Sequence, residues 1–275
     1  MNLDALFAQP QALPTIPKVA QELIQGFNDE DVAVGDIIRR ISADQVLSAR
    51  LLRLANSAYY HVPRTVATVD DAVSMLGFIN VRTMVISAGL TGCFKVMPGI
   101  DLKQFWRHSL HTAGAAKHLC GEAGLNTELA FTVGPLHAIG ELVLHAGMPA
   151  AMLQIDKSIK MLDPRRFAAQ RQALGYTYVE VGTELARKWK FPDELCQAIA
   201  ASGEPMQQAP FNAVGAVVHI AAWRSRAQEN LLNAEEIEAT WPLAVGDKLG
   251  LTVAAVLRDF PAWADLSAGM EELIS

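Results

Sequence analysis

The spacing of apolar residues is helical along almost the whole chain. Val19, Leu23, Ile24 and Phe27 are separated by four, one and three positions, which places them on one face of a helix. No segment alternates apolar and polar residues as a half-buried strand does, and no Asn-Gly or Asp-Gly pair marks a hairpin. The sequence therefore predicts an all-α fold of roughly a dozen helices.

Polar residues and glycines mark where several of these helices begin and end. Thr68 can cap a helix over 69–76, and Gly77 then separates it from a second helix. Ser42 is the expected N-cap of the helix that starts at Asp44. The remaining helices are expected at 102–123, 127–146, 148–160, 163–173, 177–189, 192–200 and 211–228.

The chain is rich in apolar residues, which raises the question of a membrane protein. Hydrophobic residues make up 51% of it and charged residues 19%. The longest charge-free runs are about a dozen residues, short of the roughly 18 that span a bilayer. Asp4 stands where a signal peptide would carry a basic residue. We therefore expect a cytoplasmic protein without a membrane span.

The acidic residues are concentrated at one end. The net charge is −6, and the segment after residue 227 holds nine acidic and two basic residues. The part before it is close to neutral, so neither part resembles a binder of the phosphate backbone, and nucleic-acid binding is disfavoured. The three cysteines lack paired spacing, which argues against a disulfide framework.

Histidines are the first candidates for chemistry. His108, His111 and His118 share one expected helix at spacings of three and seven. His137 and Glu141 lie one turn apart and could share a metal ion, although a hydrogen-bonded structural imidazole is the alternative for each histidine. No phosphate-binding loop, nucleophile elbow or zincin motif is present.

A group of arginines and tyrosines is the second candidate. It consists of Arg50, Arg53, Tyr59, Tyr60, Arg64 and Arg82. Such a group could form a phosphate-reading or partner-binding surface with stacking rings. Alternatively, the guanidinium groups tie helix ends and loops together.

Three blocks of sequence, in order, resemble the HDOD domain. The first runs from Leu13 to Ile86 and contains LPTIP, LLRLANSAYY and the AVSMLG step. The second block consists of FWRHSLHTAGAAKHL and AFTVGPLHAIGELVL. The third is LGYTYVEVGTELARKWKFPDELCQAIA. The HDOD family comprises bacterial signalling modules related to HD-type metal-dependent phosphohydrolases.

The resemblance implies a multi-helix, HD-like architecture. An N-terminal helical lobe, at about 11–100, is expected to pack on an HD-like helical lobe at 101–205. Together residues 1–205 would form the HDOD domain, and 206–275 would form an acidic helical extension.

The resemblance also locates the positions at which HD enzymes hold metal. His108 matches the first histidine of that site, and His137 matches the histidine of the His-Asp pair. Three departures follow: Ala138 replaces the paired aspartate, Ala222 stands where the last aspartate is sought, and Tyr178 replaces a histidine. A catalytic metal needs about three protein ligands and an open position for water. We therefore expect no bound metal, no cofactor and no catalytic residue.

Two functions remain open. The first is a non-catalytic signal-transduction module that binds a protein partner of a signalling pathway or a small ligand such as a nucleotide second messenger. The second is a residual phosphohydrolase acting on a nucleotide or phosphodiester. In it, His108 and His137 would hold a divalent metal weakly, with help from Glu141, Glu180 or Glu184.

Overall fold

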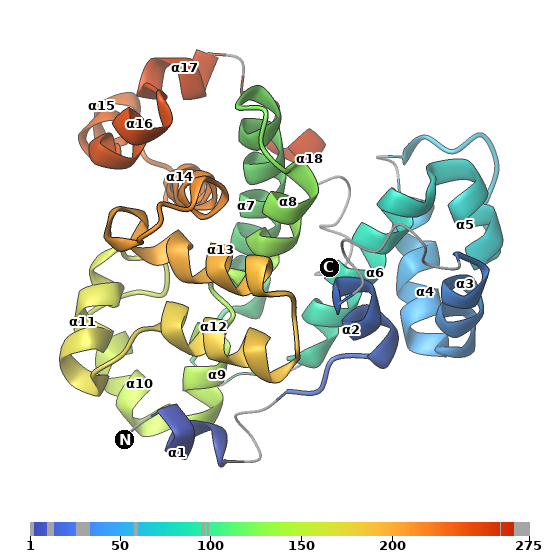
Figure 1. Cartoon of the computed structure of the whole chain (residues 1–275), viewed down its shortest axis with the longest axis horizontal. Coiled ribbons are helices and arrows are strands. Elements are labelled where there is room, and N and C mark those ends of the chain that lie inside the picture. Colours follow the sequence, from blue (N-terminus) through green and yellow to red (C-terminus); the bar gives the residue numbers. More distant parts are fainter. Residues whose placement is uncertain are drawn as a thin grey trace.

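The computed structural model describes residues 3–9, 14–25, 34–57, 60–94, 97, 99–258 and 260–266. Every regular element within these ranges is a helix, which confirms the all-α prediction (Figure 1). The helices form two groups, with α2 to α6 on one side of the molecule and α7 to α16 on the other.

The N-terminal lobe is built around one long apolar helix. Its helices are α2 (Lys18–Gln25), α3 (Val34–Ala43), α4 (Gln45–Ala55), α5 (Val69–Leu76) and α6 (Phe78–Cys93). Helix α6 packs against α2, α4 and α5, and side chains such as Leu51, Leu54 and Met84 are fully buried between them. Burial of these apolar stripes stabilises helices that would be too short to persist alone.

The predicted helix ends are partly correct. Thr68 accepts a hydrogen bond from the backbone N–H of Asp71, and Gly77 separates α5 from α6 with φ at +83°. The expectation for Ser42 is wrong. The Asp44 side chain accepts from the N–H of Leu47 and caps α4. Ser42 still lies within α3, where its hydroxyl donates to a carbonyl one turn earlier.

The second lobe surrounds the long helix α7 (Leu102–Glu122). The others are α8 (Thr127–Leu136), α9 (Gly140–Gly147), α10 (Pro149–Asp156), α11 (Arg165–Leu174), α12 (Tyr178–Lys188), α13 (Asp193–Gly203) and α14 (Ala213–Glu229). Helix α7 packs against α8 and α14, α13 packs against α12 and α14, and α9 packs against α12 (Figure 1).

The single helix expected at 127–146 is wrong, because the chain turns between α8 and α9. Pro135 cannot donate a backbone hydrogen bond, and the N–H of Ile139 bonds three residues back to Leu136 in a tighter turn. Gly140 then allows a close approach to α12, since a Cβ at this position would collide with the carbonyl of Tyr178. The helix expected at 148–160 is also shorter and ends at Asp156.

The stretch Thr127–Gly147 is long and apolar enough to cross a membrane by length and composition, with a mean hydropathy of 1.3. In this fold, 94% of it is buried among other helices. Its apolar character is therefore accounted for by its position in the core of the second lobe.

The chain beyond residue 205 is also helical where it is described. After the short 3-10 helix η3 (Pro205–Gln207) and α14 come α15 (Ala234–Ala239), α16 (Leu243–Leu249), α17 (Val253–Arg258) and α18 (Trp263–Leu266). The domain division at 205 stays a prediction. Helix α14, which lies beyond it, nevertheless packs along α7 and α13 inside the second lobe.

Hydrogen bonds and ion pairs join the two lobes. The side-chain amides of Gln21 and Gln25 in α2 both donate to the carbonyl of Trp189, at 2.8 and 2.9 Å. Between α6 and α8, Arg82 lies 3.8 Å from Glu128. The N-terminal lobe therefore packs on the HD-like lobe, as the family resemblance implies.

Candidate functional site

A cavity of about 390 Å³ lies in the second lobe, between α7, the α8–α9 turn, α11, α13 and α14. Its inner wall includes the buried side chains of His108, His137 and Ser202. Its outer wall includes the exposed residues Asn230 and Thr240. The cavity wall therefore runs from buried histidines to residues at the protein surface.

The five positions expected at a former metal site all line this cavity. They are His108, His137, Ala138, Tyr178 and Ala222. The rings of His108 and His137 pack edge to face, with their centroids 5.4 Å apart. The residue types that resemble an HD-type site are therefore brought together by the fold.

Three imidazoles in the wall, those of His108, His137 and His219, each bond through Nδ1 to a fixed oxygen. These oxygens are Ser225 Oγ at 3.0 Å, the Gly134 carbonyl at 2.5 Å and the Ser202 carbonyl at 2.8 Å. A carbonyl can only accept, so Nδ1 carries the proton in the last two pairs. The Ser225 hydroxyl donates to the carbonyl of His108, which leaves it to accept from His108 Nδ1. Each Nε2 therefore keeps its lone pair.

The same three histidines are held neutral. Burial places the pKa of His108 well below its usual value, and the neighbouring His137 and Arg226 lower it further. Burial also lowers the pKa of His137 to about 4 and that of His219 below its ordinary value. The wall therefore offers three uncharged hydrogen-bond acceptors at neutral pH.

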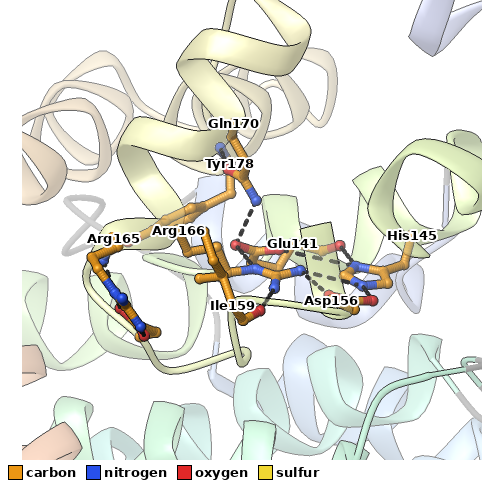
Figure 2. A network of polar contacts seen from close by, with 9 residues as sticks. Glu141, His145, Asp156, Ile159, Arg165, Arg166, Gln170 and Tyr178 are labelled. Carbon is orange, nitrogen blue, oxygen red and sulfur yellow. Dashed lines mark hydrogen bonds and ion pairs between the residues drawn. The ribbon is translucent and has the colours of Figure 1, made fainter. Parts of the chain in front are cut away.

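Glu141 lines the cavity, and one oxygen of its carboxylate is bound to neighbouring side chains (Figure 2). Oε1 accepts from Arg166 Nε at 3.0 Å and from the Gln170 amide at 2.7 Å. Arg166 in turn pairs with Asp156 Oδ1 at 2.7 Å and donates to the carbonyl of Ile159 at 2.9 Å. This network, of Glu141, Arg166, Gln170 and Asp156, connects α9, α10 and α11 and engages Oε1 of Glu141. Oε2 is buried, accepts no hydrogen bond from the described residues and lies 3.9 Å from His145 Nδ1.

The other carboxylates near the site are also occupied or lie elsewhere. Asp163 lines the cavity, but Arg165 holds it through hydrogen bonds that lower its pKa. The proposed rescue ligands Glu180 and Glu184 line a separate hollow. Glu180 closes the N-terminus of α12, and Glu184 lies 3.6 Å from Arg187. Neither faces the cavity that contains His108 and His137.

This set of donors does not fit a catalytic metal of the HD type. Hard divalent cations prefer carboxylate oxygens, and the two positions at which the family would supply them are Ala138 and Ala222. In the part of the chain that the structure describes, no three His, Cys, Asp or Glu side chains are grouped so as to hold a metal ion.

The wall contains two cations that sequence reasoning missed, Arg166 and Arg226. The side chain of Arg226 lines the cavity, and no hydrogen bond or ion pair joins its guanidinium to another residue in the described ranges. Burial lowers the pKa of Arg226, and Tyr178 and Asp163 oppose this shift. A signal was present in the expected helix 211–228, because five lining residues recur there at helical spacing. They are His219, Ala222, Trp223, Arg226 and Ala227.

The arginine and tyrosine group lies in the N-terminal lobe, and three of its arginines contact other parts of the protein. Arg50 donates to the carbonyl of Ala88 at 2.8 Å and occupies space that Gly92 leaves open. The two other pairs are Arg64 with Asp71, at 2.8 Å, and Arg82 with Glu128.

The remaining members of this group are placed differently. Arg53 is exposed and Tyr60 is half-buried, while Tyr59 lies outside the described residues. A role of this group in binding a partner stays a prediction.

Several known proteins are similar to this chain. A putative phosphohydrolase from Shewanella amazonensis SB2B is 29% identical, with 98% of each chain covered and a TM-score of 0.78. A putative signal transduction protein from Marinobacter aquaeolei VT8 is 26% identical, with 95% of this chain and 60% of that chain covered and a TM-score of 0.73.

A protein of Treponema pallidum (strain Nichols), described as uncharacterized, is 25% identical over 193 residues. The match takes in 68% of this chain and only 37% of that relative, so the chain spans well under half of its length. Residues 13–205 match the HDOD domain, which is more than half of the chain. The protein belongs to the HDOD family.

Proposed function

We propose that this protein is a non-catalytic regulatory module of the HDOD type, which acts in signal transduction by binding a ligand or a protein partner. One observation carries the proposal. The cavity keeps the imidazoles of His108 and His137, but Ala138 and Ala222 stand at the positions where an HD enzyme supplies carboxylates.

The chemistry of HD-type hydrolysis explains why this matters. A metal ion must lower the pKa of a bound water so that it can attack phosphorus at neutral pH. Three neutral imidazoles line the cavity, but no three His, Cys, Asp or Glu side chains among the described residues are grouped so as to hold a metal ion. Oε1 of Glu141 already pairs with Arg166 at 3.0 Å. A mechanism with two metal ions fits this site least well, because it depends on carboxylates that bridge the ions.

The relatives are consistent with either role in the family, since one is named a putative phosphohydrolase and another a putative signal transduction protein. The side chains that this chain offers as metal ligands favour the role in signal transduction. The proposal keeps the cytoplasmic location expected from the sequence. It also keeps the exposed surface around Arg53 and Arg64 as a place where a protein partner could bind.

The proposal is tested by metal content and activity on the same purified protein. We expect far less than about one equivalent of transition metal per chain, and no hydrolysis of a chromogenic phosphodiester when Mn²⁺ or Mg²⁺ is added. About one bound equivalent, together with turnover that His108→Ala abolishes, would overturn the proposal and establish the residual phosphohydrolase.

A second variant tests the alignment of the metal site. Ala138→Asp should raise the affinity for Mn²⁺ by about tenfold or more, because it adds an oxygen ligand beside His137. Ala150→Asp, at an exposed position of α10, is the matched control for added charge and should leave Mn²⁺ affinity unchanged. Equal affinities of the two variants would show that position 138 is not the position of the missing aspartate.

A further inference from the structure

Arg226 is in an unusual position for an arginine. It faces a cavity whose other charged side chains have partners: Glu141 bonds to Arg166, and Asp163 bonds to Arg165. The guanidinium of Arg226 has no such partner in the described part of the chain. A charge that is partly removed from water without a partner costs free energy, so this arrangement does not stabilise the free protein.

The groups around Arg226 indicate which kind of ligand could bind beside it. The Nε2 atoms of His108, His137 and His219 present lone pairs, so they accept hydrogen bonds from N–H or O–H groups. The rings of Phe105, Phe167 and Trp223 line the same cavity and supply apolar faces. A matching ligand therefore carries one anionic group, several hydrogen-bond donors and an apolar or flat face.

The dimensions of the cavity limit the size of such a ligand. Its volume of about 390 Å³ lies toward the lower end of pockets that hold small organic molecules, which run from about 300 to 1,000 Å³. The lining face of α14 extends from His219 to Asn230, which is about 16 Å along a helix. This length accommodates a compact molecule with an anionic group at some distance from a ring.

We propose that this cavity binds a small organic anion with a flat, donor-bearing ring, of the size of a nucleoside monophosphate, and that Arg226 holds its anionic group. The inference rests on the proposed function, because the anion is taken to be bound and released unchanged and not hydrolysed at a metal centre. A guanidinium pairs with phosphate and carboxylate alike, so the anionic group is either of these. The neutral histidines accept from the donors of the ring.

Calorimetric titration of the full chain tests the proposal. The probes are AMP and GMP for a phosphate and orotate for a carboxylate, each compared with an uncharged counterpart (adenosine, guanosine and uracil). We expect at least one anion to bind about tenfold or more tightly than its counterpart, as a charge-assisted hydrogen bond to Arg226 requires. The class of probe that binds more tightly, phosphate or carboxylate, identifies the anionic group of the ligand.

Variants of Arg226 make the assignment specific. Arg226→Met should weaken binding of that anion by about tenfold or more, while Arg226→Lys should retain part of the affinity because it keeps the charge. The control is Arg187→Met on the exposed side of α12, which should bind as the wild type does. Far-UV circular dichroism establishes that each variant is folded.

Three results would overturn the proposal: no binding of any of the three anions, equal binding of charged and uncharged probes, or wild-type affinity in Arg226→Met. Its failure is distinguishable from failure of the proposed function. Hydrolysis of AMP or GMP by protein that carries metal would refute the proposed function. Absence of both metal and anion binding would refute only the proposed ligand of the cavity and would leave the proposed function standing.

Discussion

Two arginines in the wall of one cavity are placed in opposite ways. Arg166, on α11, is 1% exposed and contacts Glu141, Asp156 and the carbonyl of Ile159 (Figure 2). Arg226, on α14, has no hydrogen-bonding or ion-pairing partner in the described ranges. The comparison indicates that the α9–α11 side of the cavity holds the fold together, while the α14 side is suited to recognition.

The largest effect is expected from Arg166. Arg166→Met should lower the free energy of unfolding by about 3–5 kcal/mol, because it leaves the Glu141 carboxylate buried without its cation. Urea denaturation at pH 7 measures this loss. Glu141→Gln is the control, since its amide oxygen still accepts from Arg166 and Gln170, and it should lose less. If Arg166→Met loses under about 1 kcal/mol, the network is not structural and the comparison fails.

The next effect concerns the histidines on the other side of the cavity. The pKa of His137 is about 4 in the folded protein and 6.5 in its ordinary state, so the unfolded chain binds more protons between these values. Stability should therefore fall as the pH drops from about 6.5 toward 4, by up to about 3 kcal/mol from His137 alone. His108 acts in the same direction.

Urea denaturation at pH 7.5, 6 and 5 checks this dependence. His137→Asn, which cannot be protonated, should give a flatter profile than the wild type. Identical profiles for the two proteins would mean that His137 is not held neutral by burial.

A smaller effect extends the comparison to the N-terminal lobe. Arg50→Met should lower the free energy of unfolding by about 1–2 kcal/mol, because the carbonyl of Ala88 loses a donor. Gln45→Met, at an exposed position of the same helix, should change it by less than about 0.5 kcal/mol. Unchanged stability of Arg50→Met would favour a binding role for Arg50 over a structural one.

Local signals in the sequence predict much of the fold. The threonine cap at Thr68 and the break at Gly77 depend only on neighbouring residues, and both are observed. The turn that divides 127–146 depends on more distant groups, because Gly140 must lie against the carbonyl of Tyr178. Apolar periodicity does not show this contact, since both halves of the segment are buried.

The candidate site, like the fold, could be predicted from the sequence only in part. The resemblance identified five of the residues that line the cavity, including His108, His137 and Ala138. It did not show that Glu141 pairs with Arg166, which lies 25 residues away, or that Arg226 lacks a partner among the described residues. Ion pairs of this kind are set by how helices pack, so a single sequence leaves them undetermined.

The most direct test of the contrast is the stability of ligand-free Arg226→Met at pH 7. We predict a free energy of unfolding equal to that of the wild type or higher by up to about 1 kcal/mol, because the substitution removes a partly buried charge that has no partner within the described ranges. A loss approaching that of Arg166→Met would contradict the account, since it would mean that Arg226 serves the fold and not a ligand.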